Sequence, residues 1–134
     1  MPITFANAAQ ELTYTKLADY LKSSIFRNSM RSHSDQPQFD LLYQEATLIE
    51  VEVLAWDMNP WDETELAIVR ASSCVTIGSQ GETDLMRYLL AENRRMRFGA
   101  FQLDEAGQVL FTHSVLGGEN LDLLELQTCI LAVA

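Results

Sequence analysis

The stretch TLIEVEVLAWD, residues 47–57, alternates apolar and acidic side chains from Ile49 to Val53. Successive side chains of a β-strand point to opposite faces of the sheet, so this period of two predicts a strand with one buried and one exposed face. Such a strand suits an antiparallel sheet that is covered on one side. The buried side is expected to hold Ile49, Val51, Val53 and Ala55, and the exposed side Glu50 and Glu52.

Four further segments predict strands, and turn residues separate them. Asn59-Pro60 marks a turn after the strand over residues 47–57, because proline disfavours the helical region for the residue before it. The segment DEAG, residues 104–107, predicts a hairpin turn with glycine where a positive φ is needed. The four predicted strands cover residues 39–43, 66–77, 96–103 and 109–116.

Three segments have the spacing of apolar residues that is typical of amphipathic helices. The first covers residues 13–26 and is followed by a predicted loop over residues 28–38. The second begins at Thr83 and the third at Asn120, because a side-chain oxygen at such positions can cap a first turn. The apolar face holds Tyr14, Leu17, Tyr20, Leu21 and Ile25 in the first helix, and Leu85, Met86, Leu89 and Leu90 in the second.

The resulting order, α-β-β-β-α-β-β-α, predicts a single α+β domain over residues 1–134. Its strands should form an antiparallel sheet with the helices packed on one face. The other face is then expected to be buried by a second chain or by a client protein. Because the final stretch CILAVA, residues 129–134, has neither a capping residue nor a polar close, we expect further residues to follow Ala134.

The charge balance argues against two classes of partner. Nineteen acidic residues against nine basic ones give a net charge of −10, which repels nucleic-acid phosphates and anionic lipid headgroups. Cys74 and Cys129 lie far apart inside apolar runs, which predicts buried thiols in a reducing compartment. The first residues lack the pattern of a signal peptide, so the expected location is cytoplasmic.

Candidate catalytic and metal-binding patterns are weak, and we expect neither an enzyme nor a cofactor. His113 and Ser114 are neighbours on a predicted strand, so they point to opposite faces and cannot act as base and nucleophile together. The acidic segment 57–65 departs from a calcium-binding loop, because Trp61 replaces a ligand and Asp62 replaces the required glycine.

Two groups of residues are candidates for protein binding. Trp56 and Trp61 can serve as aromatic anchors at an interface, although half-buried packing explains them equally well. Arg94 and Arg97 belong to a group of arginines around the end of the second predicted helix. They either compensate the helix dipole or form an electropositive site for a partner's carboxylate, and both interpretations stay open.

A longer motif resembles a known family. The run LLAENRRMRFGAF, residues 89–101, continues through DEAG at 104–107 to FTHS at 111–114. This pattern resembles the YbjN and type III secretion chaperone-like proteins of cyanobacteria. The order of helices and strands over nearly the whole chain is also similar to that of class I type III secretion chaperones.

The resemblance implies a cytosolic, non-enzymatic homodimer that binds an extended segment of a client protein. The family uses its second helix for dimerisation, which implies a dimer interface at Leu85, Met86, Leu89 and Leu90. One member of the cyanobacterial branch assists carboxysome shell assembly by holding the tail of a shell protein, so such a tail is the implied client. The residues expected to contact the client are Trp56, Trp61, Arg94, Arg97, Phe98, Phe101 and Phe111.

Two other functions remain as alternatives. A regulatory domain that senses a small ligand is compatible with the same composition. A small hydrolase would need His113 beside two carboxylates in a cleft, since catalysis requires convergent titratable groups.

Overall fold

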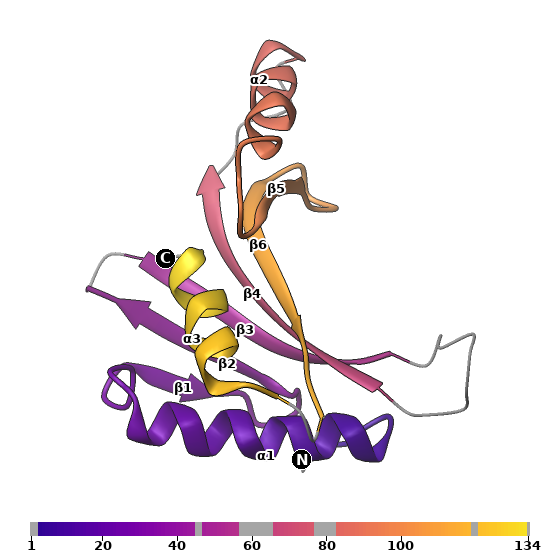
Figure 1. Cartoon of the computed structure of the whole chain (residues 1–134), viewed down its shortest axis with the longest axis vertical. Coiled ribbons are helices and arrows are strands. Elements are labelled where there is room, and N and C mark those ends of the chain that lie inside the picture. Colours follow the sequence, from indigo (N-terminus) through magenta and orange to yellow (C-terminus); the bar gives the residue numbers. More distant parts are fainter. Residues whose placement is uncertain (1–2, 45–46, 57–65, 77–82, 119–120, 134) are drawn as a thin grey trace.

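The computed structural model of the chain describes residues 3–44, 47–56, 66–76, 83–118 and 121–133. Over these ranges the chain forms a six-stranded antiparallel sheet in the order β1-β2-β3-β4-β6-β5, with three helices (Figure 1). The predicted α+β class with an antiparallel sheet is confirmed. The elements are α1 (Ala8–Ser23), β1 (Met30–Ser32), β2 (Gln38–Tyr43), β3 (Thr47–Trp56), β4 (Leu66–Thr76), α2 (Thr83–Asn93), β5 (Ala100–Leu103), β6 (Val109–Leu116) and α3 (Leu123–Ala132).

The core lies between one face of the sheet and the helices α1 and α3. Strand β3 supplies it as the alternation predicts, because Ile49, Val51 and Val53 are all buried. Full burial of an aliphatic side chain of this size contributes roughly 1.5–3 kcal/mol. The other large core residues are Leu17, Leu21, Phe26, Phe39, Leu41, Val69, Leu126 and Ile130.

Helix α1 begins earlier and ends earlier than the sequence pattern predicts. Its N-cap is Asn7, whose side chain accepts a hydrogen bond from the backbone N–H of Gln10 at 2.8 Å. It ends after Ser23, because both the N–H and the hydroxyl of Ser24 donate to the Leu21 carbonyl. The prediction that Ile25 lies on the apolar helix face was therefore wrong, and its side chain is 73% exposed.

Two strands differ from the prediction. Strand β1 forms inside residues 28–38, predicted as a loop, and it pairs with β2 although Met30-Arg31-Ser32 has no apolar alternation. The strand predicted over residues 96–103 is reduced to β5, because the backbone at Gly99 has a positive φ of 84° and interrupts the extended conformation. A register shift between Cys74 and Thr76 also distorts the end of β4.

The remaining differences concern α3 and the cysteines. The N-cap of α3 is Asp122, whose carboxylate accepts from the Leu124 N–H, while the predicted cap Asn120 lies outside the described residues. Cys129 is buried as predicted, but Cys74 is exposed. Cys74 is exposed because its side chain lies on the face of β4 that no described helix covers.

The helices lie in two regions of the molecule, α1 and α3 in one and α2 in the other (Figure 1). We call the region containing α1, α3 and strands β1–β3 the body. The distal arm consists of α2, residues 94–99, β5 and residues 109–113 of β6. Strand β6 and its neighbour β4 run from the body into the distal arm, where α2 lies far from α1 and packs against β5.

Candidate functional site

A row of alternating side chains on β6 leads from the body into the distal arm. Val115 and His113 lie opposite Val69 and Ala71 of β4, which both belong to the core, so the row faces the same side as α1 and α3. Alternation along the strand adds two residues in the distal arm to this side. The β6 row therefore consists of Val109, Phe111, His113 and Val115.

Aromatic side chains extend the β6 row sideways. The rings of Phe101 and Phe111 meet edge to face, with centroids 5.1 Å apart. The rings of Phe98 and His113 make a similar contact at 5.7 Å. Edge-to-face pairs of this kind add about 0.5–1.5 kcal/mol to the burial of the rings. The predicted client-binding residues Phe98, Phe101 and Phe111 are thus brought together.

Gly99 makes this aromatic arrangement possible. Its φ of 84° is strained for other residues, and a Cβ atom there would lie 2.8 Å from the Phe111 ring and 2.9 Å from the carbonyl oxygen of Thr112. Sequence reasoning did not single out Gly99. The available signal was an isolated glycine inside a predicted strand, which often marks a close backbone approach.

His113 has a structural hydrogen bond. Its Nδ1 accepts from the backbone N–H of Gly99 at 2.9 Å, so that nitrogen carries no proton and the neutral ring holds its proton on Nε2. The backbone carbonyl of His113 accepts from the Cys129 thiol at 3.3 Å. These contacts tie the loop before β5 to β6, and β6 to α3.

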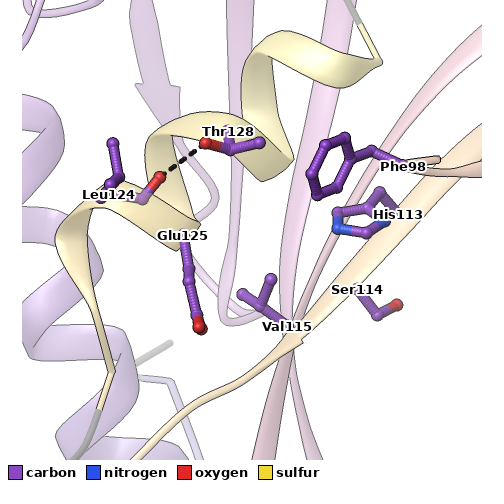
Figure 2. A pocket seen from close by; sticks show the side chains of 7 residues that line it. All are labelled: Phe98, His113, Ser114, Val115, Leu124, Glu125 and Thr128. Carbon is purple, nitrogen blue, oxygen red and sulfur yellow. Dashed lines mark hydrogen bonds between the residues drawn. The ribbon is translucent and has the colours of Figure 1, made fainter.

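A cavity of about 450 Å³ lies between α3 and the β6 row (Figure 2). Phe98 and His113 form one side of it, and Leu124 and Thr128 of α3 lie across from them. Glu125 contributes a carboxylate, the only one among the described residues that line this cavity. The two carboxylates that a hydrolase around His113 would need are therefore not assembled in the described part of the chain.

A smaller, more apolar cavity of about 230 Å³ separates α2 from β5 and β6. Leu89 is 9% exposed and lies on its wall, whereas Leu90 also reaches the outer surface and is 68% exposed. The predicted dimer residues thus divide between two directions. The lining residues are Met86, Leu89, Leu90, Phe101, Gln102, Leu103 and Val109.

The opposite face of the sheet is polar at its centre. Glu52 there forms an ion pair with Arg70 of β4 at 3.2 Å. The pKa of Glu50 is raised, first by partial burial and then by the negative charges of Asp40 and Glu52. Glu50 and Glu52 also line a cavity of about 500 Å³ under the turn between β5 and β6. Apolar side chains lie toward one end of this face, at Leu54, Ile68 and Leu116.

Arginines lie beside the aromatic group, by which we mean Phe98, Phe101, Phe111 and His113. Arg94, Arg95 and Arg97 are all exposed on the connection between α2 and β5, beside Phe98. Within the described ranges none of the three lies in an ion pair. An uncompensated positive segment on a chain of net charge −10 is an attractive site for a carboxylate.

The two predicted tryptophan anchors cannot be placed in this arrangement. Trp61 and the acidic segment around it lie outside the described residues, and of Trp56 only the backbone at the end of β3 is described. In the ranges that the structure describes, no three histidine, cysteine, aspartate or glutamate side chains gather as a metal site requires. None of the described helices is long and apolar enough to span a membrane.

Comparison with known proteins identifies the family. The family model CesT_Tir_1, which represents a type III secretion chaperone family, matches residues 42–134 and therefore more than half of the chain. No curated protein matches the chain. The matched residues include α2, the arginine segment, β5, β6 and α3, which together build the β6 row and its two cavities. The chain belongs to the CesT_Tir_1 family of type III secretion chaperones.

Proposed function

We propose that this protein is a cytosolic, non-enzymatic chaperone-like protein that holds an extended segment of a client along the β6 row. One observation carries the proposal: apolar side chains continue from the core along β6 into the distal arm, where the described helices leave them partly uncovered. Phe98 is 52% exposed and Leu103 is 56% exposed in this region. Clusters of exposed apolar side chains of this kind are typical of protein interaction sites.

The geometry favours an extended client segment. Alternate side chains of an extended chain repeat at roughly 6.6 Å, which is also the spacing of same-face side chains along β6. The two cavities lie at opposite ends of the β6 row, beside α3 and beside α2. Apolar side chains of a client strand can therefore enter both cavities while its backbone runs between them.

The arginine segment suggests the charge of the client. Arg97 directly precedes Phe98 and Arg94 lies on the same connection, so a client carboxylate close to the client's apolar side chains can form charge-assisted hydrogen bonds with these arginines. The acidic remainder of the protein repels other acidic surfaces and keeps a complex soluble. We therefore expect a client segment that combines apolar and acidic residues.

A homodimer is part of the proposal. Tyr88 and Leu90 are exposed on opposite flanks of α2, and a two-fold axis beside the Leu90 flank would place one apolar patch against itself. Met86 is partly exposed one turn before Leu90 and can extend this contact. Leu85 lies on the Tyr88 flank, and Leu89 supports α2 from the inside. Of possible clients, the tail of a carboxysome shell protein is the one implied by the resemblance of residues 89–114.

Affinity capture from a cyanobacterial lysate, read by mass spectrometry, tests the proposal. The Phe98→Asp variant is compared with the wild-type protein and with Ile25→Asp, which places the same charge at a similarly exposed apolar position outside the distal arm. We expect one dominant client to be lost only with Phe98→Asp. Identical proteins captured by all three would contradict the proposed site, and a shell protein among those lost would identify the client.

A small-ligand sensor is the second candidate, because the cavity beside α3 is large enough for a metabolite. A thermal-shift screen against common metabolites distinguishes the two functions, since a ligand raises the midpoint according to its occupancy. A metabolite that stabilises the wild-type protein but not a Phe98→Asp variant would favour the sensor.

A further inference from the structure

The side chain of Asn93 forms two hydrogen bonds with the main chain of a single residue in β5. Its Oδ1 accepts from the N–H of Phe101 at 2.6 Å, and its Nδ2 donates to the Phe101 carbonyl at 3.2 Å. A carboxamide presents an acceptor and a donor side by side, as the C=O and N–H of one residue in a neighbouring antiparallel strand would. Asn93 is the last residue of α2, so this contact also attaches α2 to the sheet.

Strand β5 lies at one end of the strand order, so its outer edge has no neighbouring strand in the described sheet. An open edge presents unpaired N–H and C=O groups that attract strands of other chains. Charged residues or proline often protect such edges, but β5 has the sequence Ala100-Phe101-Gln102-Leu103 and contains neither. A different protection is therefore needed here.

We infer that Asn93 closes the free edge of β5 in the place of a further strand, and that it thereby prevents β5 from pairing with β5 of a second copy of this chain. The second copy is the specific competitor because of symmetry. If two β5 strands met antiparallel about a two-fold axis at Phe101, the two phenylalanines would exchange the same N–H and C=O bonds that Asn93 now satisfies.

The surrounding contacts agree with this inference. The N–H of Gly99, just before β5, donates to the His113 side chain of β6, so it is not available to a second copy either. Leu103 is 56% exposed on the same strand, so an unprotected edge would offer apolar side chains as well as main-chain groups.

Amide hydrogen exchange, followed residue by residue with NMR, tests the first part of the inference. In Asn93→Ala we expect the Phe101 amide to exchange about fivefold faster or more, which corresponds to the loss of a hydrogen bond of about 1 kcal/mol. Asn93→Asp retains the acceptor for this N–H, so the same amide should stay close to its wild-type rate. Gln127→Ala, which removes an exposed carboxamide from α3, is the matched control.

Two results would overturn this part. One is a Phe101 amide that exchanges equally slowly in Asn93→Ala and in the wild-type protein. The other is a uniform acceleration in Asn93→Ala that includes core amides such as that of Val51, because Asn93 would then support the whole fold rather than the edge.

Sedimentation velocity over a range of concentrations tests the second part. Asn93→Ala should form larger species than the wild-type protein as concentration rises, and its Phe101 amide should regain protection in those species. Rapid exchange at Phe101 without any increase in size would overturn the role against a second copy. This outcome is independent of the proposed client site, because client capture is measured with Phe98→Asp while Asn93 is intact.

Discussion

The body and the distal arm share strands β4 and β6 but use their apolar side chains differently. In the body, Leu17, Leu21 and Ile49 have no exposed surface, because two helices close over one face of the sheet. In the distal arm, Leu90 of α2 and Leu103 of β5 remain more than half exposed, because α2 and β5 cover each other only in part. The body thus completes its own core, whereas the distal arm presents apolar surface that a partner can bury.

Strand β6 shows how the burial of apolar side chains changes along a single element. Val115 lies beside α3 and the core, and Val109 at the other end is buried by α2. Phe111 and His113 lie between these helices and are only partly buried. A single strand is therefore packed into the fold at its ends, and the proposed client site lies along its less covered middle.

The largest expected difference concerns the two cysteines, of which Cys129 lies in the body and Cys74 near the distal arm. Burial raises the pKa of the Cys129 thiol to about 11, so at pH 8 its thiolate fraction is on the order of 10⁻³. Iodoacetamide should modify the exposed Cys74 at least about a hundredfold faster in the native protein. Mass spectrometry of tryptic peptides measures both rates, and equal rates would contradict the closed packing of α3.

Truncating an apolar side chain should lower the free energy of unfolding more in the body than in the distal arm. Leu21→Ala removes a fully buried side chain of the body and should lower the free energy of unfolding by about 2–5 kcal/mol. Leu103→Ala in the distal arm should change it by no more than about 0.5 kcal/mol. Urea denaturation followed by circular dichroism provides the comparison. Equal losses for the two variants would show that the distal arm is packed as tightly as the body.

A glycine substitution sharpens the comparison inside the distal arm. In Gly99→Ala the added methyl group meets a positive φ and close approaches to Phe111 and Thr112. The free energy of unfolding should fall by about 2 kcal/mol or more. Gly107→Ala is the matched control, because Gly107 has a φ of 81° but no atom within 4 Å of the added methyl group. Gly107→Ala should lower the free energy of unfolding by only about 1 kcal/mol. A loss for Gly107→Ala as large as that for Gly99→Ala would contradict the close packing of the aromatic group.

The smallest predicted effect is a pH dependence on the uncovered face of the sheet. The pKa of Glu50 is raised above its ordinary value of 4.5 by burial, Asp40 and Glu52, so ionisation is less favourable in the folded state than in the unfolded state. The protonated form of Glu50 favours the folded state, and this contribution to stability is complete at a pH below the pKa of Glu50 in the unfolded state. It is lost as the pH rises through the pKa of Glu50 in the folded state. Glu50→Gln should therefore stabilise the protein at pH 7 by about a few tenths of a kcal/mol after solvent screening.

Denaturation curves at pH 7 and at pH 3.5 measure this difference. The advantage of Glu50→Gln should disappear at the lower pH, where Glu50 is protonated in both states. A Glu50→Gln variant less stable than wild type at pH 7 would indicate that the carboxylate makes a net favourable interaction.

Much of the fold could be predicted from sequence where its signals are local. The alternation in residues 47–57 identifies β3 and its buried face, and the glycine in the DEAG turn identifies the hairpin between β5 and β6. The exposure of Ile25 could not be predicted, since it depends on how the Ser24 hydroxyl binds the last turn of α1. Strand β1 escaped prediction because its pairing with β2, rather than its own composition, makes it a strand.

The candidate site was only partly predictable for a related reason. Phe98, Phe101 and Phe111 are recognisable as apolar residues near one another in sequence, and they do gather around β6. Asn93 and Gly99 act through partners on other elements, so nothing in their immediate sequence indicates those contacts. Local patterns reveal which side chains are apolar, whereas the packing of distant elements determines which of them stay exposed.

Site-specific photo-crosslinking in cyanobacterial cells tests the central claim most directly. A photoreactive benzoylphenylalanine is placed at position 98 in the distal arm or at position 25 in the body, since both native side chains are exposed. We predict covalent adducts with a client protein from position 98 and none from position 25. Adducts from position 25 alone, or the same adducts from both positions, would contradict a client site in the distal arm.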